Sequence, residues 1–304
     1  MQKLLMFALV GVAAQLVDGS LGMAYGVTST TLLLMVGTNP AMASAMVQFA
    51  QLGTTLASGV SHQSFGNVDW RVVRTIALPG AVGAFIGANV LVWLSATYVD
   101  LAKVVMAVLL LGLGVYLLSR FTLKGVRTDR LDEPPTRRFL VPLGATAGFV
   151  DATAGGGWGP IGTPALLASG RMEPRKVIGS VSTSEFVVTL AASAGFIAGL
   201  GVADIEWAIV AGLLLGGAVV SPFAAYLVRV IPARMLGSLV GGLIVLTNSR
   251  TLLKAATGTD AGPLQFAVYA IVVAVWAWAI RYSWRAHRAE RATEPSTEPE
   301  RVPA

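Results

Sequence analysis

Apolar runs separated by short polar segments occupy almost the whole chain. The runs 104–118, 208–220 and 266–280 contain no charged residue at all. A bilayer core is ~30 Å thick, and a helix needs about 20 apolar residues to cross it. The pattern therefore predicts an all-α integral membrane protein, a polytopic helical bundle. The predicted segments are residues 4–18, 22–36, 41–61, 71–94, 101–119, 139–154, 160–169, 177–200, 206–228, 234–254 and 264–283.

The first five segments correspond in order to the next five, which indicates an internal duplication. A basic, Pro-containing stretch separates the halves and is expected to be an exposed linker. One further apolar segment has no partner in the first half, and the charged tail after it is expected to be disordered. The expected divisions are a first repeat at 1–119, a linker at 120–138, a second repeat at 139–256, an extra transmembrane helix at 257–284 and a tail at 285–304.

A Gly-rich segment with one carboxylate occurs near the start of each half. Residues 17–26 read VDGSLGMAYG, and residues 150–159 read VDATAGGGWG. The Asp, two Gly and an aromatic residue hold the same relative places in both copies. Other positions correspond as well, with small insertions in the later part. These pairs are Gly11 with Gly144, Thr30 with Thr163, Pro40 with Pro174, Gln51 with Glu185, Thr55 with Thr189 and, approximately, Trp70 with Trp207.

Composition supports the membrane assignment. The chain is 55% hydrophobic and 12% charged, whereas soluble domains carry about 25% charged residues. Its 34 Gly residues suit closely packed membrane helices. The absence of Cys excludes disulfides, thiolate catalysis and Cys-ligated metals. The net charge of +6 does not indicate nucleic-acid binding, because the basic residues lie in the loops and the tail.

The N-terminus, Met1-Gln2-Lys3 before an apolar run, can also be read as a signal peptide. The correspondence with the second repeat begins at Gly11 and favours a retained helix instead, because cleavage would remove the first copy of the motif.

The distribution of Lys and Arg predicts how the chain lies in the cytoplasmic membrane. Cytoplasmic loops carry an excess of basic residues, so we expect the 120–138 linker and the C-terminus inside the cell and the N-terminus outside. If each opening pair of short segments is a broken-helix hairpin, each half crosses the membrane an odd number of times. The two halves then have opposite orientations. This is the inverted-repeat architecture of many secondary transporters, whose site lies at the repeat interface.

The two Gly-rich motifs are the candidate substrate site. A helix that begins at a break inside the membrane presents unpaired N–H groups and partial positive charge, which favour an anion. The neutral hydroxyls of Thr28 and Ser29 add donors to this region. Packing of the glycines and aromatic rings is the competing interpretation. The candidate substrate-binding residues are Gly22, Tyr25, Gly26, Thr30, Gly155, Gly156, Gly157, Trp158, Gly159, Thr163, Ser182 and Ser184.

Three acids lie in apolar surroundings: Asp18, Asp151 and Glu185. Acids inside a membrane often carry protons, so we expect them either to couple transport to protons or to cap the adjacent helix breaks. Trp70 and Trp207 are expected to be interfacial anchors. No metal, cofactor or catalytic residue is expected.

The second motif resembles a known family. Gly148-Phe149-Val150-Asp151 and Gly155-Gly156-Gly157-Trp158-Gly159-Pro160 resemble the TauE/SafE, or sulfite exporter, family of membrane permeases. The resemblance covers residues 4–283, although the first motif lacks the Gly run and the Pro. Residues 18–23 and 67–69 resemble a branch associated with sulfur assimilation. The resemblance implies transport of sulfite, sulfonates or related small anions.

These observations favour a secondary transporter that moves sulfite, sulfate or an organosulfonate by alternating access, with proton coupling. A passive anion channel and a structural membrane subunit are the alternatives. An enzyme is not expected, because a Ser hydrolase needs a base beside its nucleophile, and the one His in the apolar region is His62. The expected partners are a small inorganic or organosulfur anion and the lipid bilayer, with no nucleic acid.

Overall fold

The computed structural model describes residues 2–21, 23–123, 131, 133–203, 205–230, 233–259 and 262–293. These residues form eleven α-helices, and the described ranges contain no strand. Each predicted apolar segment coincides with one helix. The helices are α1 (Gln2–Leu21), α2 (Tyr25–Met35), α3 (Pro40–Ser64), α4 (Trp70–Thr97), α5 (Val99–Leu123), α6 (Arg137–Ala154), α7 (Trp158–Ser169), α8 (Pro174–Leu200), α9 (Trp207–Val230), α10 (Ala233–Thr257) and α11 (Pro263–Thr293).

Local sequence signals set several helix ends. The Asn39 side chain accepts from Ala41 N at the start of α3, where Pro40 occupies the first turn. Asp69 Oδ1 accepts from Arg71 N at 2.9 Å at the start of α4. Gly170, with φ 67°, ends α7 in the left-handed conformation that closes many helices.

The helices differ widely in length and in how apolar they are. Four described helices are long and apolar enough to cross a membrane: α4, residues 99–120 of α5, residues 175–200 of α8 and residues 263–286 of α11. In contrast, α2 has 11 residues and α7 has 12. At 1.5 Å per residue these extend over about 17–18 Å, roughly half of a bilayer core. The prediction of a helical membrane protein is confirmed. Of the two short segments expected at the start of each half, only the second is short, because α1 has 20 residues and α6 has 18.

Helices of the first half pack mainly against helices of the second half. α1 packs along α9, and its counterpart α6 packs along α4. α3 contacts its own counterpart α8, and α5 contacts its counterpart α10. Gly11 lies against the carbonyl of Leu213, and its counterpart Gly144 lies against the carbonyl of Ile76. The inter-half contacts are therefore reciprocal.

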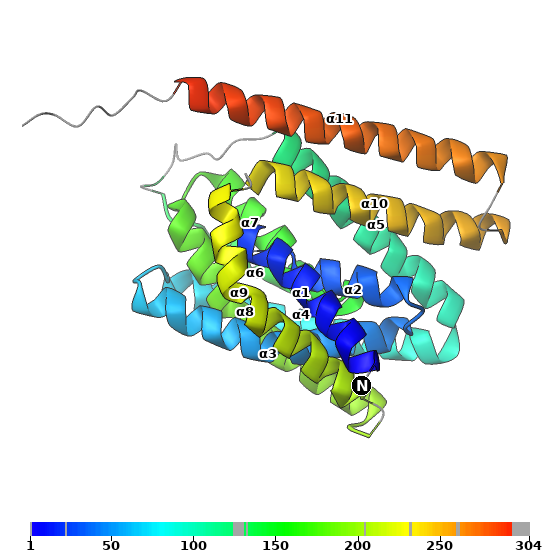
Figure 1. Cartoon of the computed structure of the whole chain (residues 1–304). Coiled ribbons are helices and arrows are strands. Elements are labelled where there is room, and N and C mark those ends of the chain that lie inside the picture. Colours follow the sequence, from blue (N-terminus) through cyan, green and yellow to red (C-terminus); the bar gives the residue numbers. More distant parts are fainter. Residues whose placement is uncertain are drawn as a thin grey trace, which may run out of the picture.

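The C-terminal helix lies at the edge of this arrangement. Figure 1 shows α11 along one side of the bundle, beside α10. Only 11% of its most apolar stretch is buried, against 39–44% in the other three candidate spans. The helix continues to Thr293, so the expectation of disorder from residue 285 is wrong for residues 285–293. Ala, Arg and Glu dominate that stretch, and all three are strong helix formers.

Candidate functional site

The second Gly-rich motif joins α6 to α7 through a break that Asp151 closes. Gly155 ends α6 with φ 68°, and α7 starts at Trp158. Asp151 Oδ1 accepts hydrogen bonds from Gly157 N at 2.8 Å and Trp158 N at 3.0 Å. Asp151 Oδ2 accepts from Gln48 Nε2 on α3 at 2.8 Å. The buried carboxylate therefore caps α7, and in this conformation it occupies two N–H groups that an anion would otherwise use.

The structure brings the two motifs into direct contact. A Cβ on Gly26 would lie 2.7 Å from Gly156 Cα, and a Cβ on Gly159 would lie 3.0 Å from Met23 Cα. Gly26 and Gly159 are counterparts in the duplication, as are Met23 and Gly156, so these two contacts are equivalent. The Thr30 hydroxyl also donates to Gly155 O at 2.7 Å. Only residues without a Cβ permit backbones to approach this closely.

Part of the first motif cannot be compared in the same way. Gly22 lies outside the described residues, and so does the side chain of Asp18.

The two motif aromatics hold the motifs to neighbouring helices. Trp158 is fully buried and donates from Nε1 to Val181 O at 3.0 Å. The Tyr25 hydroxyl donates to Leu213 O at 3.0 Å. Both polar groups are therefore already bonded to backbone carbonyls, which favours the packing interpretation for these rings in this conformation.

Polar side chains follow the contact between α3 and α8. Gln51 Nε2 donates to Glu185 Oε1 at 3.2 Å, and the hydroxyls of Ser58 and Ser182 lie 2.7 Å apart. Gln48 and Gln51 are buried. Sequence reasoning aligned Gln51 with Glu185 but did not assign either glutamine to the site.

The remaining predicted residues contribute less directly. Thr163 is buried within α7, and the Ser184 hydroxyl donates to Val181 O on its own helix at 2.8 Å.

Several buried polar atoms in this region have no hydrogen-bond partner among the described residues. On α2 they are the hydroxyls of Thr28, Ser29 and Thr31, and on α3 they are the Oε1 atoms of Gln48 and Gln51. Buried polar groups in proteins are nearly always bonded to protein, water or ligand. Unbonded hydroxyls beside a pair of broken helices are therefore available to a polar ligand.

Comparison with known proteins identifies the family of the chain. The family described as sulfite exporter TauE/SafE matches residues 7–251, which include both Gly-rich motifs. The chain belongs to the TauE/SafE family. It is 46% identical over 284 residues to the "probable membrane transporter protein YtnM" of Bacillus subtilis (strain 168), with 93% of each chain covered. No solved structure matches the chain. The resemblance found in the second motif is confirmed, and the chain is a multi-pass membrane transporter.

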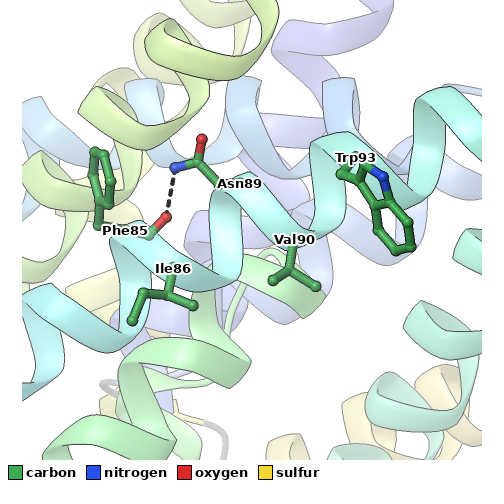
Figure 2. Close-up of a pocket in the computed structure, with 5 residues that line it drawn as sticks. All are labelled: Phe85, Ile86, Asn89, Val90 and Trp93. Carbon is green, nitrogen blue, oxygen red and sulfur yellow. Dashed lines mark hydrogen bonds between the residues drawn. The ribbon is translucent and has the colours of Figure 1, made fainter.

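An apolar groove elsewhere on this TauE/SafE protein does not belong to the candidate site. It is lined by Phe85, Ile86, Asn89, Val90 and Trp93 along one side of α4 (Figure 2). Asn89 is the polar residue of the groove, and its side-chain amide donates to Phe85 O of the same helix at 2.8 Å. The exposed rings and the lack of any motif residue in the groove fit a surface that faces lipid.

Proposed function

We propose that this chain is a secondary transporter that moves a small oxyanion, namely sulfite, sulfate or an organosulfonate, across the cytoplasmic membrane by alternating access. The observation that carries the proposal is the reciprocal contact of the two Gly-rich breaks, beside buried hydroxyls without protein partners. Membership of the TauE/SafE family supports the choice of substrate class.

The charges around the site suit an anion that must be released again. Among the described residues, no Lys or Arg is buried, and the buried hydroxyls of α2 are neutral donors. An oxyanion held by hydroxyl and backbone N–H groups is desolvated without being locked into an ion pair. Because a fully paired buried charge is costly to separate, neutral donors favour turnover.

The directions of the helices support an inverted repeat. On α8, Gly179 approaches Asn67, just before α4, and Gly199 approaches Val92 on α4. Residue numbers therefore rise together, and the two helices run parallel. α4 turns back from α3 after a short loop, and neighbours joined by short loops are antiparallel. α3 and its counterpart α8 therefore run in opposite directions, as inverted repeats require.

Alternating access needs surfaces between the halves that can move past each other. Glycines give smooth contacts between α4 and α6 and between α1 and α9. We infer that one half rocks against the other around the two motifs, with Glu185 as the candidate proton carrier.

The test is a flux assay with the full-length protein in proteoliposomes. Sulfite, sulfate, thiosulfate and a small sulfonate are each offered at two pH gradients. The proposal expects saturable flux of at least one anion that changes with the pH gradient at constant membrane potential. Flux that follows only the anion's own electrochemical gradient would identify a passive channel. Lack of flux for all four anions would favour a structural subunit.

A further inference from the structure

Gln51 and Glu185 occupy a special position in the duplicated fold. They are counterparts in the two repeats, and they are hydrogen-bonded to each other at 3.2 Å. A residue and its counterpart in the other repeat can touch only near the axis that relates the two repeats. The pair therefore lies on the approximate two-fold axis that relates α3 to α8.

The Gln51 amide also connects this pair to the Gly-rich breaks. A Cβ placed on Gly26 would lie 3.3 Å from Gln51 Oε1 and 2.8 Å from Gly155 O. Gln51 Oε1 is buried and has no hydrogen-bond partner in the described structure. One side of the amide thus meets the Glu185 carboxyl, and the other side faces the point where the two motifs meet.

The chemistry of the pair allows two protonation states without loss of contact. In this structure a Glu185 oxygen accepts from the amide N–H, and an ionised carboxylate can make this contact. A protonated Glu185 becomes a donor, and the amide oxygen is the acceptor that it needs. Because the counterpart residue is Gln rather than Glu, the pair carries one titratable group instead of two repelling carboxylates.

We propose that Gln51 and Glu185 together form the proton-coupling element of this transporter, with the proton on Glu185 and Gln51 linking its protonation state to the anion site at the Gly-rich breaks. The inference rests on the proposed transport function. Protonation removes a negative charge beside an incoming anion, so anion and proton bind together. Affinity for the anion therefore falls as the pH rises.

Among the described residues, the helices packed against α8 carry several other ionisable groups. Asp151 on α6 caps α7 and binds Gln48. The remaining groups lie near helix ends: His62 on α3, Arg71 and Arg74 on α4, Arg137 and Arg138 on α6, and Arg175 and Lys176 on α8 itself. α7 carries no ionisable side chain. Glu185, in the middle of α8, is the carboxyl that directly meets its repeat counterpart.

An exchange of the two residues tests the pair. Flux of the four anions is measured for wild type, Glu185→Gln, Gln51→Glu and the double variant Gln51→Glu/Glu185→Gln. Glu185→Gln is expected to reduce stimulation by a pH gradient about tenfold or more, as typical coupling free energies imply. Gln51→Glu is expected to slow flux by adding a second carboxyl. The double variant returns a single carboxyl to the axis and is expected to recover stimulation to within about threefold of wild type.

Matched exchanges outside the site serve as controls. The control substitutions are Gln63→Glu and Glu173→Gln. Gln63 is exposed near the end of α3, and Glu173 is exposed just before α8. Both are expected to leave flux and its pH dependence unchanged.

The outcomes separate this inference from the proposed function. If the wild-type protein transports none of the four anions, both the proposed function and this inference are overturned. Wild-type flux with full stimulation in Glu185→Gln, or a double variant present in the membrane but still uncoupled, overturns only the inference. If the double variant is absent from the membrane, Gln51→Leu decides the question. Loss of stimulation in that variant, which retains Glu185, supports the pair, and unchanged stimulation overturns it.

Discussion

At the scale of single residues, the site is made largely of groups that already have bonding partners. Thr30, Tyr25 and Trp158 donate to backbone carbonyls, and Asp151 caps a helix. The α2 hydroxyls of Thr28, Ser29 and Thr31 differ, because they are buried without a partner in the described structure. Substitutions that remove one of these hydroxyls should therefore weaken anion binding and leave the fold stable.

Thr28→Val is expected to weaken anion binding without destabilising the protein. Valine keeps the shape and removes only the hydroxyl. A hydrogen bond to a charged group is worth roughly 1.5–3 kcal/mol, so KM for the transported anion should rise about tenfold or more. Thermal unfolding in detergent should be unchanged or occur at a higher temperature, because an unbonded buried hydroxyl is lost.

The matched control for this substitution is Thr146→Val. Thr146 is exposed on α6, and its hydroxyl donates to Pro142 O of the same helix at 2.7 Å. KM should not change in this variant. An equal rise in KM for both variants would count against a ligand role for Thr28.

At the scale of elements, the helices could be predicted and their mutual contacts could not. Long uncharged runs leave few alternatives to membrane helices, so all eleven segments were located from sequence. The end of α11 was misjudged because charge was taken as a sign of disorder in a stretch of helix-forming residues. Gln48 and Gln51 were missed because a neutral amide inside an apolar helix looks unremarkable until its tertiary partner is known.

The contact between the two breaks leads to a prediction for Gly26→Ala. The added methyl group would meet Gly156 Cα at 2.7 Å and Gly155 O at 2.8 Å, both backbone atoms that cannot move aside like a side chain. The two motifs should be forced apart, and flux in proteoliposomes should fall at least tenfold, about the effect of 1.4 kcal/mol on a barrier.

Gly112→Ala on α5 is the matched control. Gly112 is helical, and a Cβ there would meet nothing within 4 Å. Alanine is the better helix former by about 0.8–1.0 kcal/mol, so this variant should keep full flux and equal or higher thermal stability. If Gly26→Ala behaved in the same way, close contact of the motifs would not be required for transport.

At the scale of the whole molecule, one geometric relation accounts for several separate contacts. The pairs Gly26–Gly156 and Met23–Gly159, and the single pair Gln51–Glu185, are all what an approximate two-fold relation between the halves would produce. Such a relation would place the proposed site between two similar half-structures. If each half adopted the conformation that the other half now has, the result would be a second conformation of nearly equal energy.

The proposed inverted orientation is directly testable because the chain has no Cys. Ser64→Cys, at the end of α3, and Ala203→Cys, just after α8, each introduce one thiol at an exposed position beyond equivalent helices. A membrane-impermeant maleimide should label Ala203→Cys in intact cells and Ser64→Cys only in inside-out vesicles, because basic residues mark the cytoplasmic side. Labelling of both thiols from the same side would mean that the repeats are parallel. The two Gly-rich motifs would then enter the membrane from one face, and exchange of the halves could not open the site alternately to both sides.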